Sequence, residues 1–433
     1  MQKMPQYVTI NVENILRGEL GQDYRRHLGE VCNQLKIPVD RITVSDVLPI
    51  ARALLRKLTD EMDYETATRV EKKLHIYKLT QDLRTLEGKN DPENIRRRAD
   101  LLVSLGNLCL SAGMAKEAIT YFKNANVLIN RINYEAKLGE IYRGLGHAYK
   151  MIHDWENAKR YFDKAIPICH KLKDYSGMSD AYAGIGYINW KTGNFSEALR
   201  SYQKSLENTN KIGNKSLLVT IYIEYGNVYN EMGDLDKAEE FYKIALDAMS
   251  DEKDIWQIAR VYNNLGDLEL QRKNWEKAIE YFQKCIEYGS KINHARMIGW
   301  GYFNTAEALA KLGRANEAIK YCNKALQYLE KINDKEGMCS VYRNYSLAHR
   351  VRGDYENAMK YAKKSLSLAK ELKRPFLVAE AMIEYGIIKG KEGEREEMAN
   401  YIKEAKKIFE DIGAERKVKE VDEVIAEYGI TDL

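Results

Sequence analysis

Small and apolar residues recur along this chain at helical spacing, and the pattern itself returns every forty residues. Residues 262–285, YNNLGDLELQRKNWEKAIEYFQKC, show one copy. Tyr262, Leu265 and Gly266 stand at i, i+3 and i+4, which is one face of a helix. A second face of the same kind begins at Ala278 and continues through two aromatic residues. The pattern therefore predicts two consecutive amphipathic helices in each forty-residue unit.

Several columns of residues keep this register over eight copies. The first column of small residues is Gly106, Gly146, Gly186, Gly226, Gly266, Ala306, Ser346 and Gly386. A second column is Ala118, Ala158, Ala198, Ala238, Ala278, Ala318, Ala358 and Met398. An aromatic column is Tyr142, Tyr182, Tyr222, Tyr262, Tyr302 and Tyr342. Because the tyrosines fall on the same face as the small residues, we expect them to pack between helices and not to stack on nucleobases.

The residues between the two helices are those that end one helix and start the next. Examples are Gly193-Asn194, Gly233-Asp234 and Gly353-Asp354. Glycine favours the left-handed position after a helix, and Asn or Asp caps the free amides of the following one. Each unit is therefore predicted to be a helical hairpin. A single hairpin leaves an apolar face bare, so the units must stack.

The pattern resembles the tetratricopeptide repeat family over roughly residues 95–418. The resemblance is carried by Tyr262, Leu265, Gly266, Ala278, Phe282, Cys285 and their equivalents. The family's usual period is about 34 residues, and the longer period here resembles cell-polarity and G-protein signalling scaffolds and peptide-sensing bacterial regulators. The resemblance implies an all-α, right-handed superhelical solenoid of helix-turn-helix repeats. It also implies a non-enzymatic scaffold that binds other proteins.

Outside the repeats the chain is harder to interpret. We expect four segments: an N-terminal arm or helical segment in 1–44, a degenerate helical hairpin in 45–90, eight repeats in 91–411 and a C-terminal capping helix in 412–433. The stretch QYVTINV, residues 6–12, alternates weakly and favours a short strand or an extended arm. The helix expected after it is broken near Gly21. Asp91 and Pro92 are typical of a helix start and are expected to open the first repeat.

Composition favours a soluble, folded protein. Hydrophobic residues make up 45% of the 433 residues and charged residues 30%. No run of about 18 apolar residues predicts a membrane helix, and the N-terminus has no apolar stretch of the kind found in signal peptides. The six cysteines include no CxxC pair, so they predict buried thiols in a reducing compartment. We therefore expect a cytoplasmic protein without a metal site or cofactor.

No set of residues predicts an active site. The motifs GLGHAY (144–149) and GIGYIN (184–189) carry two glycines of a dinucleotide-binding loop. Both lack the third glycine and fall inside predicted helices with no preceding strand. Cys169 and His170 are adjacent, so on a helix they point apart and cannot act as nucleophile and base. We expect that the protein is not an enzyme.

Binding residues are expected on the first helix of each hairpin, which lines the concave side of such solenoids. Positions that flank the column of small residues are free of packing and predict the surface that contacts a partner. The candidate residues are Arg143, His147, Lys150, Tyr187, Trp190, Asn227, Asn230, Arg260, Asn263, Asn264, Asp267, Asn304, Glu307, Arg343, Asn344 and Arg350. Their mixed charge suits a peptide or a protein segment better than a phosphate backbone.

Asn263, Asn264, Asn304 and Asn344 form a column of asparagines within this set. Asparagine offers a donor and an acceptor, so such a column can hold an extended peptide backbone. Asparagine is also a poor helix former, and its recurrence inside helices needs a reason. The alternative is that these residues bond to neighbouring helices and hold the stack. Both interpretations remain open at this point.

An alternative function places the activity in the N-terminal region, as a regulator or sensor. In this reading the region docks on a large assembly such as the ribosome, or on nucleic acid, with a homodimer as one arrangement. The residues it would use are Arg25, Arg26, Arg52, Arg56, Lys57, Lys72, Lys73, Arg96, Arg97 and Arg98. Its only basis is this clustering, because the net charge of +4 is small. Ordinary solvated lysines and arginines are the favoured explanation of the cluster.

Overall fold

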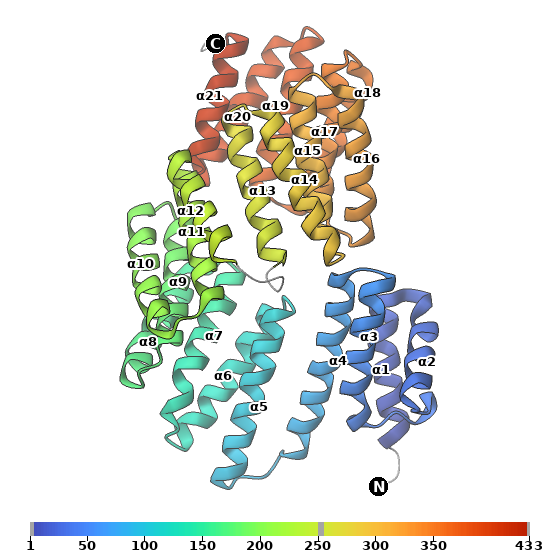
Figure 1. Cartoon of the computed structure of the whole chain (residues 1–433), viewed down its shortest axis with the longest axis vertical. Coiled ribbons are helices and arrows are strands. Elements are labelled where there is room, and N and C mark those ends of the chain that lie inside the picture. The colour runs from blue at the N-terminus through green and yellow to red at the C-terminus, as the bar shows by residue number, and fades with distance from the viewer. Residues whose placement is uncertain (1–3, 250–254, 431–433) are drawn as a thin grey trace. The chain divides into compact units, whose positions relative to one another are not determined.

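A computed structural model describes residues 4–249 and 255–430 of the chain. Within these ranges the only regular structure is helical (Figure 1). The chain divides into two compact units, Met1–Ile221 and Tyr222–Leu433. The predicted all-α repeat fold is confirmed, since helices follow one another in hairpins at the expected forty-residue spacing.

Four helices precede the repeats and share one hydrophobic core. They are α1 (Met4–Leu20), α2 (Tyr24–Leu35), α3 (Val47–Glu61) and α4 (Tyr64–Thr85), with short 3-10 turns η1 (Gly21–Asp23), η2 (Val39–Arg41) and η3 (Val44–Asp46). The strand or extended arm expected in residues 6–12 is wrong, because this stretch lies inside α1. Val8, Val12 and Leu16 are buried at a spacing of four, which is a helical face. The break near Gly21 is confirmed, with φ +60° at that residue.

The repeats follow as pairs of antiparallel helices. In unit 1 and across its end they are α5 (Pro92–Ser111) with α6 (Ala115–Arg131), α7 (Leu138–Met151) with α8 (Trp155–Lys171), α9 (Tyr175–Lys191) with α10 (Phe195–Ile212), and α11 (Lys215–Met232) with α12 (Leu235–Ala248); η4 (Glu135–Lys137) precedes α7. The later pairs are α13 (Ile255–Gln271) with α14 (Trp275–Lys291), α15 (Ala295–Lys311) with α16 (Ala315–Lys331), α17 (Lys335–Val351) with α18 (Tyr355–Leu372), and α19 (Pro375–Lys391) with α20 (Arg395–Asp411). The last helix is α21 (Glu415–Tyr428).

The hairpin turns have the predicted glycines, and two of the predicted caps are confirmed, whereas Asn194 makes no side-chain capping bond to α10. Gly193, Gly233 and Gly353 have φ between 77° and 82°, which is the left-handed region. Asp234 and Asp354 each accept a hydrogen bond from a backbone amide in the first turn of the following helix. At the first repeat, Asp91 caps α5 and Pro92 begins it, as predicted.

Close packing within the hairpins depends on the first column of small residues. An added Cβ at Gly266 would lie 2.4 Å from Cε1 of Phe282, and at Gly226 it would lie 2.4 Å from Cε1 of Tyr242. In the first five hairpins the aromatic ring of the second helix therefore lies directly against the glycine of the first. The tyrosine column packs between helices as predicted. The Tyr262 ring lies 5.6 Å from that of Tyr288.

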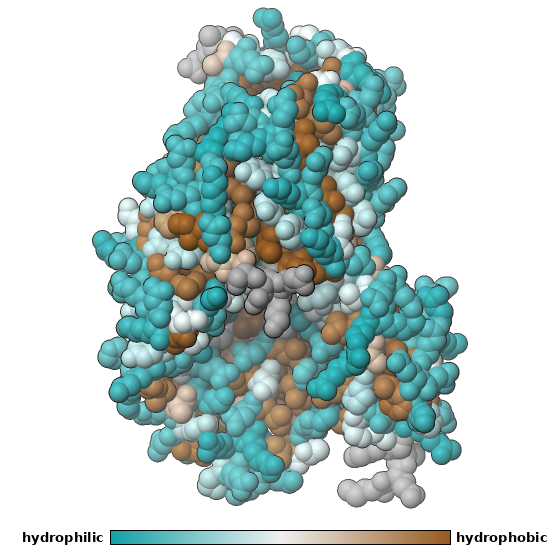
Figure 2. Space-filling view, viewed as in Figure 1, coloured by the Kyte–Doolittle hydropathy of each residue, from teal (hydrophilic) through white to brown (hydrophobic). Residues whose placement is uncertain are grey.

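All six cysteines are free and buried, as the sequence predicted. Burial raises the pKa of Cys32 and of Cys109 to about 11 and that of Cys285 to about 12. These thiols are therefore protonated and unreactive in the folded protein. On the face shown in Figure 2, hydrophilic side chains cover most of the surface and apolar ones lie in narrow strips between them.

A candidate binding pocket on the inner face of unit 2

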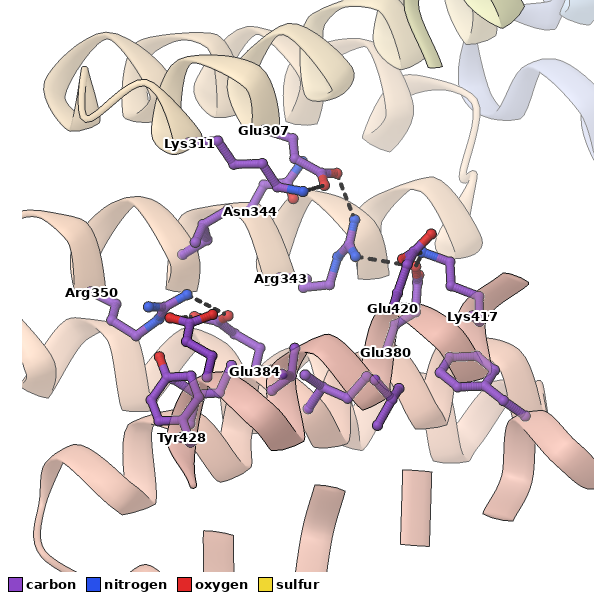
Figure 3. Close-up of a pocket in the computed structure, with 17 residues that line it drawn as sticks. Glu307, Lys311, Arg343, Asn344, Arg350, Glu380, Glu384, Lys417, Glu420 and Tyr428 are labelled. Atoms are coloured by element: carbon purple, nitrogen blue, oxygen red, sulfur yellow. Dashed lines mark hydrogen bonds and ion pairs between the residues drawn. The ribbon is translucent and has the colours of Figure 1, made fainter. Parts of the chain in front are cut away.

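The first helices of unit 2 enclose a pocket of about 310 Å³ together with α21 (Figure 3). We call the side of unit 2 formed by α11, α13, α15, α17 and α19 its inner face. The lining residues are Glu307, Lys311, Arg343, Asn344, Leu347, Arg350, Glu380, Ile383, Glu384, Ile387, Phe409, Lys417, Glu420, Val421, Val424, Glu427 and Tyr428. The volume is at the lower end of the range for ligand pockets and fits a few side chains of a peptide.

A row of ion pairs runs through the pocket. The Arg343 guanidinium donates from Nη2 to Glu307 at 2.9 Å and from Nη1 to Glu380 at 3.2 Å. Lys311 lies 3.2 Å from Glu307, and Lys417 of α21 lies 3.1 Å from Glu380. In Figure 3 Arg343 lies between the two carboxylates, with Lys417 beside Glu380. The row therefore joins four helices, α15, α17, α19 and α21.

A second ion pair joins α17 and α19 further along the same two helices. Arg350 donates to both carboxylate oxygens of Glu384, at 2.8 and 3.2 Å. This two-point geometry is the strong form of an arginine–carboxylate contact. Tyr428 lies nearby, as Figure 3 shows. The apolar wall of the pocket is formed by Leu347, Ile383 and neighbouring aliphatic residues.

The charges of the pocket hold one another in their ionised forms. Burial alone would raise the pKa of Glu307, but the charges of Arg343, Lys311 and Lys417 outweigh it and lower the pKa to about 2. For Glu380, burial is again outweighed, mainly by Arg343, and its pKa is lowered. Glu380 in turn raises the pKa of Lys417 against the effect of burial. At neutral pH the row is therefore fully charged.

Two polar atoms of the pocket lining have no hydrogen-bond partner within the described residues. They are Nε of Arg343 and Oδ1 of Asn344. Asn344 is only 1% exposed, and its Nδ2 donates to the carbonyl of Phe303 at 2.7 Å. A buried donor or acceptor without a partner costs about 1–3 kcal/mol. A ligand that offers one acceptor and one donor would recover that free energy.

The predicted column of asparagines is linked by hydrogen bonds between successive first helices. Asn304 donates to Asn263 at 2.9 Å, and Asn264 donates to Asn227 at 3.0 Å. The Tyr242 hydroxyl also donates to Asn227, at 2.7 Å. These contacts are the ones expected of residues that hold the stack.

The other predicted residues on α11 and α13 are also engaged with each other. Arg260 donates to Glu224 at 2.8 Å. Gln271 donates to Asn230 at 2.8 Å and to Asp267 at 3.0 Å. Contacts with a partner at these positions would have to replace bonds within the protein or add to them.

In unit 1 the predicted residues form two local groups. Arg143 contacts Asp174 at 3.0 Å and Asp180 at 3.2 Å, and His147 lies 2.9 Å from the same Asp180. Burial opposes the charge on Asp180, but His147 and Arg143 together lower its pKa.

The second group of unit 1 is aromatic. The Tyr187 and Trp190 rings lie 5.5 Å apart, edge to face. The Lys150 ammonium lies 4.7 Å from the centre of the Tyr187 ring, and Lys191 lies 3.6 Å from that of Trp190. Such cation–ring contacts contribute about 0.5–1 kcal/mol at exposed sites.

Several pocket residues were not predicted from the sequence. They are Glu380, Glu384, Lys417, Glu420 and Tyr428. A signal for two of them was present, because Glu380 and Glu384 occupy in the eighth repeat the positions of Arg260 and Asn264 in the fifth. The same register extends into α21, where Glu420 lies forty residues after Glu380, whereas Lys417 and Tyr428 do not fall on the positions chosen from the sequence.

The basic residues of the N-terminal region are partly neutralised by neighbouring acids. Lys57 contacts Glu30 and Glu61, and Lys73 contacts Glu19. Arg26 lies 4.0 Å from Glu61. These acids interrupt the cluster, which weakens the case for a nucleic-acid surface.

The described residues contain no group of three or more His, Cys, Asp or Glu residues placed to hold a metal ion. None of their helices combines the length and apolar character needed to cross a membrane.

Comparisons with known proteins agree with the repeat architecture. A family profile described as the tetratricopeptide repeat matches residues 137–211, 177–251, 217–291 and 298–371, which together make up more than half of the chain. No curated protein matches the sequence. The crystal structure of the apo form of RapI is similar with a TM-score of 0.57 and 16% identity, covering 87% of this chain and 98% of that one.

Two further solved structures match with lower scores. A Rap protein complexed with competence and sporulation factor has a TM-score of 0.49 and 14% identity, over 77% of this chain and 99% of its own. A tetratricopeptide repeat protein from Parabacteroides merdae has a TM-score of 0.46 and 19% identity, over 66% of this chain and 99% of its own. The register of forty residues, the helical hairpins and the matched profile lead to one conclusion: this chain belongs to the tetratricopeptide repeat family.

Proposed function

We propose that this protein is a non-catalytic scaffold that receives a peptide or a segment of a partner protein on the inner face of unit 2. The observation that carries the proposal is the pocket, where ionised side chains lie beside an apolar wall and two buried polar atoms have no partner among the described residues. A peptide supplies the missing groups, because every residue offers an amide donor and a carbonyl acceptor. Its side chains would contact the apolar wall.

The charge pattern favours a mixed-charge protein segment over a nucleic acid. Glutamates and basic side chains alternate in the described lining, and each Arg of the pocket is paired with at least one Glu. A phosphate backbone needs an uninterrupted basic surface. The lowered pKa of Glu307 and Glu380 also makes these carboxyls poor proton donors and acceptors near neutral pH.

The test is partner capture with a charge-swapped pocket. The double variant Arg350→Glu with Glu384→Arg keeps an ion pair but reverses the charges presented to a ligand. Its matched control is Arg314→Glu with Glu317→Arg, an ion pair on the surface of α16 that is about half exposed and outside the pocket. Both variants and the wild type are used for cross-linking and mass spectrometry from the source cells, with and without ribonuclease.

The proposal expects the partner to be lost with the pocket swap and retained with the surface swap. Retention by both variants would contradict it. Loss of the partner on ribonuclease treatment, with no effect of either swap, would favour the alternative in which the N-terminal region docks on a ribonucleoprotein.

A further inference from the structure

The last helix, α21, presents one continuous face to the pocket. Its pocket residues are Lys417, Glu420, Val421, Val424, Glu427 and Tyr428. Their spacing of three, four, seven, ten and eleven residues from Lys417 is that of a single helical face. The pocket is therefore the space that remains between this face and the helices α15, α17 and α19.

α21 is held by apolar packing of Val421 and its partly buried neighbours and by several ion pairs. Besides the contact of Lys417 with Glu380, Lys406 lies 2.7 Å from Asp422 and Lys273 lies 3.3 Å from Glu423. A further pair connects it with α11, where Arg416 lies 3.9 Å from Glu231. The pairs of Lys273 and Lys406 lie near the surface, where ion pairs are weak and are screened by salt, whereas the pair of Lys417 with Glu380 is mostly buried.

Apolar burial holds α21 less firmly than its neighbours. Val421 is its one fully buried residue in the described chain. By contrast, α20 buries Met398, Ala399, Ile402, Ala405 and Phe409. Elements with little buried apolar surface are the first to open locally.

The fit of α21 to the inner face is also incomplete. Val424 is only half buried, and the cavity of about 310 Å³ lies between it and aliphatic residues such as Leu347 and Ile383. A larger aliphatic side chain at this position would fill part of that space and gain contacts.

The charged row specifies what a helix in this place must carry. Arg343 faces two carboxylates, Glu307 and Glu380, and Lys417 supplies a further positive charge from α21. Any helix that replaces α21 needs a cation at the same position, since otherwise Glu380 would lose a partner in a poorly hydrated site.

We propose that the inner face of unit 2 is a helix-binding surface, occupied at rest by α21 and opened when an amphipathic helix of a partner protein displaces it. The partner helix carries Lys or Arg at the position of Lys417 and, seven residues later, an aliphatic residue larger than Val424. This inference rests on the proposed function, because it uses the same site, and adds the class of ligand and the competition with α21.

The experiment uses α21 itself as the probe. A fluorescent synthetic peptide of residues 415–428 is added to the full-length chain carrying Lys417→Glu, which places a like charge beside Glu380. The matched control is Lys419→Glu, at an exposed position of the same helix that does not line the pocket. Hydrogen exchange of the α21 amides and fluorescence anisotropy are measured on both variants and the wild type.

The expected results are specific. In the Lys417→Glu chain the α21 amides exchange faster and the peptide binds, whereas the Lys419→Glu chain behaves as the wild type. A peptide with Val424→Leu binds roughly fourfold tighter than the natural sequence, which corresponds to one more buried methylene group. A peptide with Lys417→Glu does not bind.

A second measurement needs no variant. In the wild type at about 1 M salt, where charges are screened beyond about 3 Å, the α21 amides are expected to exchange faster while those of α19 do not. This keeps the test valid if Lys417→Glu disturbs folding of the last repeat.

Three results would overturn the inference. The first is unchanged exchange of α21 in both Lys417→Glu and high salt. The second is an opened α21 with no binding of either peptide. The third is a Lys417→Glu chain that self-associates and takes no peptide, which would make a second copy the occupant. Partner loss in the charge-swap experiment, together with a fixed α21, would leave the proposed function intact and reject only this inference.

Discussion

The first repeats and the last ones fill the space between hairpins in opposite ways. In the first, the Phe122 ring lies where a side chain of residue 144 would stand, and a Cβ added to Gly144 would be 2.4 Å from its Cζ. Phe162 and Gly184 repeat the arrangement with the same 2.4 Å distance. In these two repeats a large ring on the second helix leaves room only for glycine on the next first helix, whereas Tyr242 and Phe282 further along are followed by Asn264 and Asn304 at the same spacing.

Two hundred residues later the same positions are reversed. Cys322 takes the place of Phe122, and Asn344 takes that of Gly144. Likewise Ala362 takes the place of Phe162 and Glu384 that of Gly184. In these repeats small residues on the second helices accompany polar side chains on the first, and both of these polar side chains line the pocket. The pocket thus lies in the repeats where a smaller residue replaces the ring of the second helix.

The largest expected effect on stability comes from giving an early repeat the residue that a late repeat has at the equivalent position. Gly144→Asn should destabilise α5–α8 by about 3 kcal/mol or more, because the new side chain collides with Phe122. Phe122→Cys alone should cost about 3 kcal/mol through lost packing. The double variant should lose about 3 kcal/mol of stability and not about 6, because the smaller side chain at position 122 leaves space for the larger one at position 144.

Local opening free energies from hydrogen exchange in α5–α8 measure this cycle. If the losses of stability of the two single variants simply add in the double variant, residues 122 and 144 do not compete for the same space.

The next effect concerns the arginines at equivalent positions, Arg143 and Arg343. Arg343→Met should cost about 3 kcal/mol, because it leaves Glu307 and Glu380 charged at 15% and 11% exposure. Arg143→Met should cost about 1 kcal/mol, because Asp180 is 40% exposed and can be hydrated. Hydrogen exchange in α17 and in α7 compares them, and equal costs would refute the distinction.

A smaller effect is a difference in pH dependence. Glu307 has a pKa of about 2 when folded and 4.5 otherwise, so its contribution to stability is present above pH 4.5 and is lost as the pH falls toward 2. Between pH 7 and pH 3 this loss is about 2 kcal/mol. Glu307→Gln should lose correspondingly less stability over that range, as followed by urea unfolding and circular dichroism.

Asp180→Asn provides the matched change in unit 1. The pKa of Asp180 is also lowered, but its greater exposure should make the acid effect smaller. An equal or larger effect at Asp180 would show that the two networks do not differ in hydration.

The smallest effect tests the role of the glycines. Gly18 lies in α1 with no atom within 4 Å of an added Cβ, so Gly18→Ala should stabilise α1 by somewhat less than 1 kcal/mol. Gly184→Ala has the same gain in helix propensity but should be destabilising, because its Cβ meets Phe162. Thermal unfolding of the two variants gives the sign directly.

The repeats could be predicted because each column of residues recurs in eight copies, so that an atypical residue in one copy does not obscure the pattern. The N-terminal α1 could not, since Val8, Ile10 and Val12 fit a strand while Val8, Val12 and Leu16 fit a helix. The sequence pointed to Arg343, Asn344 and Arg350. The same register reaches Glu420 and Val424 of α21, but it could not reveal which distant first helices they face, because contacts such as Arg416 with Glu231 join residues far apart in the chain.

The most direct test of the account places a photo-cross-linking amino acid at position 347, in the pocket, or at position 147, its equivalent in unit 1. Both chains are irradiated in the source cells, and the attached proteins are identified by mass spectrometry. The account predicts a partner cross-linked from position 347 and not from 147, and its loss when Arg350→Glu and Glu384→Arg are added. Cross-links from 147 alone, or from 347 regardless of the charge swap, would contradict a binding site on the inner face of unit 2.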